Sequence, residues 1–102
     1  MDYRVVFTKR ALAELAEIAD YISVDSPDTS ARFGNALLDH VSLLERFPRM
    51  GSVISEKPQV RRLVHGPILI FYKIREDRHR VSILRFRHGS RKPLKFRGPL
   101  SQ

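Results

Sequence analysis

The sequence contains no cysteine, so the chain can form neither a disulfide framework nor a thiolate metal site. No apolar run approaches the roughly 20 residues that a membrane-spanning helix needs. The opening residues also lack the basic region followed by an apolar stretch that marks a secretory signal. We therefore expect a protein of the cytoplasm, with no membrane as its partner.

Acidic residues are scarce in the second half of the chain. Residues 1–51 hold six Lys or Arg against eight Asp or Glu, whereas residues 52–102 hold thirteen against three, and the formal net charge is +8. This division predicts a surface for nucleic acid, an acidic protein segment or a membrane, unless the basic face is merely solvated. At this length we expect one domain over residues 1–91 and a basic tail over residues 92–102.

The first half predicts a strand followed by a helix. Tyr3–Phe7 alternates in polarity, as a strand does, and the hydroxyl of Thr8 can then cap a helix over about residues 9–24. Apolar residues recur in this helix at three- and four-residue spacing, which indicates one buried face. Its acidic residues are expected to point outward: Glu14, Glu17 and Asp20.

A second helix is expected after a short break. Ser26 is placed to cap it and Pro27 suits its first turn, while Phe47 and Pro48 close it. The two helices then form a hairpin. Residues 48–58 are rich in breakers and polar residues, so we expect a loop there.

Three strands are expected after the loop, over Val60–His65, Ile68–Arg75 and Arg80–His88, the last two joined by a polar turn. The order β-α-α-β-β-β predicts an α+β fold, with a helical hairpin packed on one face of a small, mostly antiparallel sheet. The helices then carry the acidic charge. The open sheet face and its rim carry the basic charge.

Several segments in this order resemble toxins of the RelE/ParE superfamily from type II toxin–antitoxin systems, over about residues 3 to 91. The segments are Tyr3–Thr8, Ala11 with Leu15, Tyr21-Ile22, Pro48–Gly51, Arg62-Leu63, Ile70–Ile74, and Ile83–Phe86 running into Arg87–Arg91. The resemblance implies a toxin without a cofactor, neutralised by a cognate acidic antitoxin. One branch of the superfamily cleaves messenger RNA in the ribosome, and the ParE-like branch inhibits DNA gyrase without nuclease chemistry.

Messenger RNA cleavage without a metal needs proton transfer and stabilisation of the phosphate. His88 or Tyr72 could transfer protons here. Arginines could hold two phosphate oxygens through their planar guanidinium groups. The candidates for the phosphate are Arg62, Arg85, Arg87 and Arg91.

Two departures from the ribonuclease branch favour the ParE-like branch. That branch commonly has an arginine three residues before the strand tyrosine, where this chain has Leu69, which we interpret as core. It also often has a tyrosine after the final basic motif, whereas the last tyrosine here is Tyr72. The sequence therefore predicts a gyrase inhibitor, with a ribosome-dependent mRNA endoribonuclease as the alternative.

Structural interpretations stand beside the functional ones. Tyr72 shares a strand face with Ile70 and Ile74, which favours a core residue with a bonded hydroxyl. His88 could bond backbone at the strand end, and Arg62 could pair with Glu56 or Asp39. The four histidines show no ligand spacing, so no metal site is expected.

The binding surface is expected to be basic. Arg85 and Arg87 are placed on the strand face of Val81 and Ile83, emerging where the sheet leaves the helices. A plain nucleic-acid-binding module is a third hypothesis, which lacks exposed aromatics for base stacking if Phe71, Phe86 and Tyr72 are all core. The residues predicted to bind the target or the antitoxin are Arg62, Arg85, Arg87, His88, Arg91 and Lys92.

Overall fold

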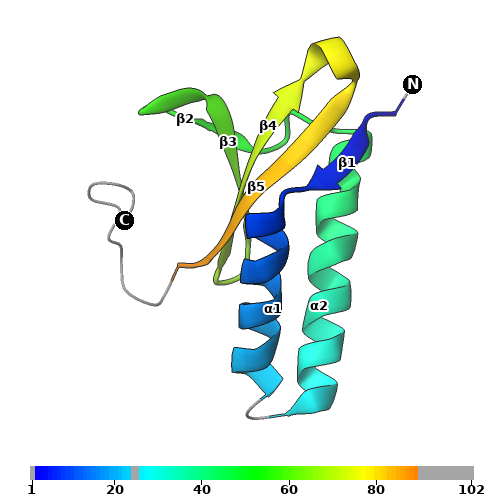
Figure 1. Cartoon of the computed structure of the whole chain (residues 1–102), viewed down its shortest axis with the longest axis vertical. Helices are drawn as coiled ribbons and strands as arrows, with labels where there is room; N and C mark the ends of the chain where they lie inside the picture. Colours follow the sequence, from blue (N-terminus) through cyan, green and yellow to red (C-terminus); the bar gives the residue numbers. More distant parts are fainter. Residues whose placement is uncertain (1, 24–25, 90–102) are drawn as a thin grey trace.

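Two helices lie side by side, joined at one end, and the strands of a single sheet extend beyond them (Figure 1). The computed structural model describes residues 2–23 and 26–89. The elements in chain order are β1 (Arg4–Phe7), α1 (Lys9–Ser23), α2 (Pro27–Ser42), a 3₁₀ turn (Leu43–Glu45), β2 (Ser52–Ile54), β3 (Lys57–His65), β4 (Ile68–Arg75), a second 3₁₀ turn (Glu76–Arg78) and β5 (Arg80–His88).

The sheet has five strands in the order β1-β5-β4-β3-β2. β1 runs parallel to β5, with Arg4 opposite Arg80 and Phe7 opposite Ile83. The other three pairs of neighbours are antiparallel. The α+β fold and the mostly antiparallel sheet are thus confirmed. The parallel pair arises because the helical hairpin carries the chain away from β1, and the last strand returns beside it.

Both predicted helix caps are present. The Thr8 hydroxyl oxygen accepts a hydrogen bond from the Ala11 backbone nitrogen at 3.0 Å. The Ser26 hydroxyl oxygen accepts one from the backbone nitrogen of Thr29 at 3.2 Å. Each cap satisfies an amide that the first turn of a helix leaves without a partner, so side-chain chemistry places both helix starts.

The sequence had indicated a loop over residues 48–58, but part of this segment forms strands. Ser52–Ile54 forms β2, the edge strand, and β3 begins at Lys57 rather than at Val60. The register between the two strands shifts between Val53 and Ile54. Pro58, which has no amide to donate, falls in the part of β3 that precedes its pairing with β4 at Arg61. Three residues with one alternation are too short a pattern to predict a strand.

A β-bulge in β5 reverses which residues face the helices. Ile83 lies opposite Tyr72 and Arg85 lies opposite Phe71, so Leu84 is an extra residue in β5. Before the bulge Val81 and Ile83 are buried, and after it Phe86 is buried. Arg85 therefore does not share the face of Val81 and Ile83, and neither does Arg87. That prediction was wrong because uninterrupted alternation was assumed.

The core lies between the hairpin and the covered face of the sheet. Within the described residues, no helix is long and apolar enough to cross a membrane. The buried cluster includes Tyr72, confirming its assignment to the core. Its members are Ala11, Ile18, Leu37, Val41, Leu44, Leu63, Ile68, Ile70, Tyr72, Val81, Ile83 and Phe86.

Candidate functional site

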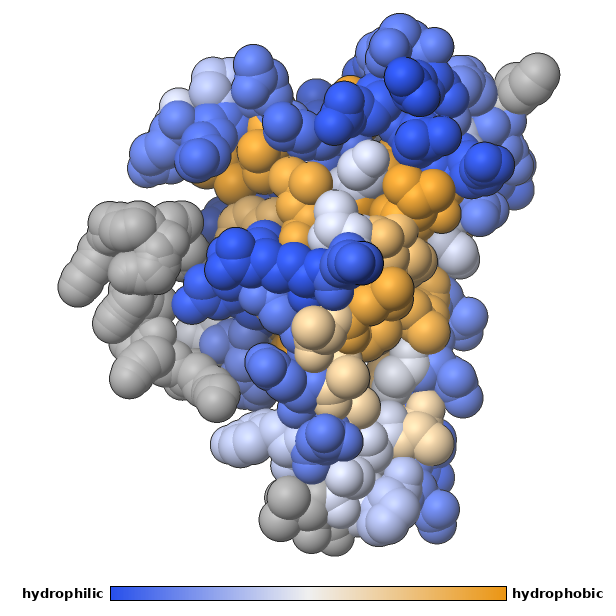
Figure 2. Space-filling view, viewed as in Figure 1, coloured by the Kyte–Doolittle hydropathy of each residue, from blue (hydrophilic) through white to orange (hydrophobic). Residues whose placement is uncertain are grey.

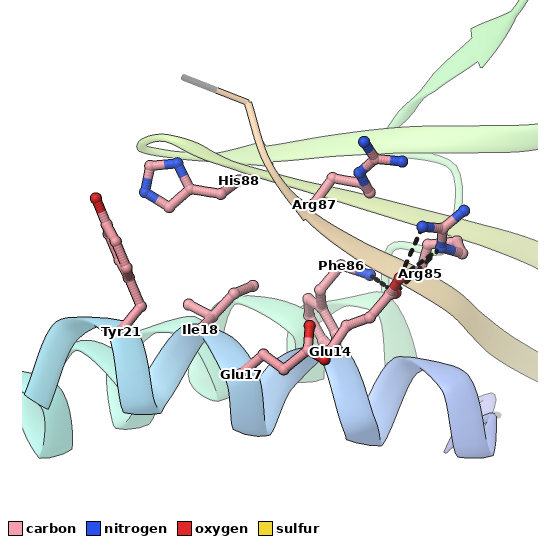
Figure 3. A pocket seen from close by; sticks show the side chains of 8 residues that line it. All are labelled: Glu14, Glu17, Ile18, Tyr21, Arg85, Phe86, Arg87 and His88. Atoms are coloured by element: carbon pink, nitrogen blue, oxygen red, sulfur yellow. Dashed lines mark hydrogen bonds and ion pairs between the residues drawn. The ribbon is translucent and has the colours of Figure 1, made fainter. Parts of the chain in front are cut away.

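A groove of about 590 Å³ runs between α1 and β5. It arises because β1 pairs with β5 only as far as Ile83, so that the following part of β5 has α1 as its neighbour instead of a strand. Figure 3 shows one wall rising from the helix and the other from the end of the strand. The lining residues are Glu14, Glu17, Ile18, Tyr21, Arg85, Phe86, Arg87 and His88.

Glu14 does not point outward as the sequence had indicated, but turns toward β5 (Figure 3). One carboxylate oxygen, Oε1, accepts a hydrogen bond from the backbone nitrogen of Phe86 at 3.0 Å. The other, Oε2, lies 2.8 Å from Nε and 2.7 Å from Nη2 of Arg85. Glu14 thus takes the place of a strand neighbour at the Phe86 amide, and it neutralises the Arg85 guanidinium.

Two more arginines lie near the Glu14–Arg85 pair. Nε of Arg10 lies 3.6 Å from Oε2 of Glu14, one helical turn away. Arg87 follows Arg85 by two residues, and burial together with the charges of Arg85 and Arg10 lowers the pKa of its guanidinium, while Glu14 acts in the opposite direction. Arginine stays charged at neutral pH. The Glu14 carboxylate therefore lies near three cations.

The other end of the groove is aromatic. The rings of Tyr21 and His88 meet edge to face, with 5.7 Å between their centres. Tyr21 is 58% exposed, whereas Ile18 beneath it is buried. A phenol ring, an imidazole and an aliphatic floor can bind a side chain that is partly apolar, because such contacts bury apolar area and leave polar edges for hydrogen bonds.

Tyr72 is on the covered face of the sheet, away from this groove. Its side chain is fully buried, and its hydroxyl donates to the carbonyl of Pro48 at 2.7 Å and accepts from the amide of Gly51 at 2.9 Å. Burial raises the pKa of this phenol. A hydroxyl enclosed in this way cannot reach an RNA substrate, so Tyr72 serves the fold.

Arg62 lies on β3, on the sheet face opposite the helices. It is exposed and stands opposite Phe71 of β4, and it forms no ion pair with Glu56 or Asp39 in the part of the chain that the structure describes. Phe71 and Leu69 share this face and are half-buried, so neither belongs to the core that their apolar character had indicated.

The structure thus gathers some of the predicted site residues and separates others. Arg85, Arg87 and His88 line one groove, whereas Arg62 and Tyr72 lie on opposite faces of the sheet. Arg91 and Lys92 lie outside the described residues, as does the tail. Within the described residues, no group of three or more His, Asp or Glu side chains could hold a metal ion.

Sequence reasoning missed the helical half of the groove. Glu14, Ile18 and Tyr21 lie four and three residues apart, which places them on one face of α1. The sequence had indicated a buried apolar face on this helix and an outward Glu14, with no groove between them. Figure 2 shows hydrophobic side chains gathered around the sheet and crossed by hydrophilic ones, while the ends of the helices are mainly hydrophilic or neutral.

Comparisons with known proteins agree with the fold. Residues 5–93 match the family model described as the ParE toxin of the type II toxin–antitoxin system parDE. A protein of Sinorhizobium fredii named as a candidate toxin, Y4kP, is 36% identical over 89 residues, which cover 84% of this chain and 88% of the relative.

Two solved structures are similar in shape. The chromosomal ParDE system of P. aeruginosa aligns with a TM-score of 0.73 at 23% identity, covering 84% of this chain and 95% of that one. The RelBE2 toxin–antitoxin complex of Mycobacterium tuberculosis aligns with a TM-score of 0.66 at 25% identity, covering 86% of this chain and 99% of that one.

Proposed function

The chain belongs to the ParE family of toxins from type II toxin–antitoxin systems, and from this premise we propose that it arrests growth by inhibiting DNA gyrase. In this proposal it acts in the cytoplasm, and a cognate acidic antitoxin neutralises it. Gyrase inhibition of this kind is protein binding, with no bond made or broken by the toxin.

The burial of Tyr72 is the observation that carries the choice between the two branches. A metal-free ribonuclease needs its proton-transfer group and its phosphate-binding arginines around one reacting phosphate. Here the Tyr72 hydroxyl bonds the backbone of residues 48 and 51 inside the protein. Arg62 and Arg85 both lie on the sheet face opposite Tyr72, and Arg85 is paired with Glu14. These positions support inhibition by binding over cleavage of RNA.

We place the antitoxin contact in the groove between α1 and β5. Arg87 and His88 offer hydrogen-bond donors at its strand wall, and Tyr21 offers an exposed aromatic surface at its helix wall. A segment that combines carboxylates with apolar side chains matches both features. The +8 charge of the chain further favours an acidic partner.

Expression of the protein alone tests the toxin activity. Growth should stop, and co-expression of a short acidic protein encoded beside it should restore growth.

The variant Arg87→Ala, which changes the groove, should weaken capture of that partner. Arg78→Ala removes the same charge from the exposed turn before β5 and is the matched control. Equal capture by both variants would place the antitoxin elsewhere.

Purified protein then separates the two targets. Supercoiling of relaxed plasmid by gyrase should fall as the toxin is added, and antitoxin should restore it. A parallel translation reaction, read by primer extension, should show intact messages. Codon-dependent cuts with unchanged supercoiling would overturn the proposal and favour the ribosome-dependent mRNA endoribonuclease.

A further inference from the structure

The Glu14 carboxylate lies near three arginines at one end of the α1–β5 groove. Glu14 bonds Arg85 through two nitrogens and lies 3.6 Å from Nε of Arg10, and Arg87 lines the same groove. We call Arg10, Arg85 and Arg87 the arginine cluster. Clusters of this kind bind phosphate, because a guanidinium can present two parallel N–H donors to two oxygens.

We propose that Glu14 determines the selectivity of the groove: by occupying the Arg85 guanidinium, it keeps the arginine cluster from binding the phosphates of nucleic acid and leaves the groove to a protein partner. The inference rests on the proposed function, since it explains how so basic a toxin reaches a protein target. A cell offers it far more RNA and DNA phosphate than gyrase or antitoxin.

The geometry makes Glu14 an effective competitor of phosphate. Its carboxylate meets Nε and Nη2 of Arg85, the donors that a phosphate would need. The side chains of Arg85 and Glu14 are only 25% and 16% exposed, so salt screens this pair less than it screens a surface pair. The second oxygen is held by the Phe86 amide, which anchors the carboxylate on the strand.

The variant Glu14→Gln removes the charge and keeps the shape. Its amide oxygen can still accept the hydrogen bond from Phe86, so the strand contact and the fold should survive. Arg85 then loses its counter-charge, and the positive charge of the cluster is no longer offset by Glu14. A nucleic-acid phosphate should take the vacated place.

Fluorescence polarisation with a labelled single-stranded RNA oligonucleotide measures the effect. We expect Glu14→Gln to bind the RNA roughly five- to tenfold more tightly than wild type at low salt. The slope of log affinity against log salt should steepen by about 0.7, the value for one further phosphate contact on a single strand.

Glu17→Gln is the matched control, because Glu17 lines the same groove from the same helix and no ion pair joins it to an arginine in the described residues. It changes the net charge equally and should alter RNA affinity much less. The double variant Glu14→Gln with Arg85→Gln should return to wild-type affinity. Equal gains for Glu14→Gln and Glu17→Gln, or no gain for either, would overturn the proposal.

The test is independent of the toxin's target. Binding of RNA needs neither gyrase nor antitoxin, so a wild-type protein that leaves supercoiling unchanged refutes the proposed function while leaving this inference intact. A wild-type protein that inhibits gyrase, with a Glu14→Gln variant that binds RNA no better, refutes only the role of Glu14.

Discussion

The Tyr72 hydroxyl and the Gly51 backbone approach each other so closely that residue 51 has no room for a side chain. A Cβ added to Gly51 would lie 2.6 Å from the Tyr72 hydroxyl oxygen and 2.9 Å from the carbonyl oxygen of Arg62. Both distances are too short for real contacts, and one of the two groups is backbone. Gly51 therefore lets the loop after α2 close onto the sheet.

Gly51→Ala should destabilise the protein. Relieving the overlap requires the loop or the Tyr72 ring to move, at a cost of about 1–3 kcal/mol in the free energy of unfolding. Urea unfolding followed by circular dichroism measures it. Gly34→Ala is the control, because no atom of the described residues lies within 4 Å of its added Cβ and alanine favours helix by about 1 kcal/mol. A stable Gly51→Ala variant would contradict the packing described.

Tyr72→Phe should lower stability and leave growth arrest intact. It removes the donor to Pro48 and the acceptor for Gly51, leaving two buried backbone groups unsatisfied at a cost of about 1–3 kcal/mol. Arrest should persist at a temperature where the variant stays folded. Loss of arrest in a folded variant would instead give the phenol a functional role.

The pair His40 and His65 should make stability fall in mild acid. Their Nδ1 atoms lie 2.8 Å apart and share a hydrogen bond, which requires one of the two nitrogens to be unprotonated. Burial and the neighbouring His40 lower the pKa of His65 from its usual 6.5, and the Phe33 ring covers it edge-on. The described residues contribute no ion pair to either imidazole.

A histidine whose pKa is lower in the folded state binds more protons when unfolded, so stability rises with pH. The contribution of His65 is complete above pH 6.5 and is lost as the pH falls through the lower pKa of the folded protein. Denaturant midpoints at pH 7.5 and 5.5 should differ, and His65→Gln, which can still bond His40, should reduce the difference. An unchanged difference would assign the pH dependence to other groups.

Tyr21→Ala should weaken antitoxin binding without affecting the fold. The ring is 58% exposed and lines the groove, so its removal should cost about tenfold or more in affinity, as for an aromatic interface residue, and less than about 0.5 kcal/mol in stability. Leu12→Ala is the control, since Leu12 is 52% exposed on the same helix and does not line the groove. Calorimetric titration with the antitoxin compares them.

The sequence by itself determined the helices, the three main strands and the α+β class. These are local properties, because periodicity and capping residues act within a few positions of the chain. The Thr8 and Ser26 caps and the core position of Tyr72 followed from such patterns. So did the acidic first half and the basic second half of the chain.

Only the tertiary structure decided the groove. The bulge at Leu84 adds one residue to β5, and a shift of one residue moves every later side chain to the other face. The position of this bulge depends on how β5 pairs with β4, which no local pattern of the sequence reveals. Glu14 turned inward for the same kind of reason: its partners, Arg85 and the Phe86 amide, are about seventy residues away and come within reach only when β5 lies along α1.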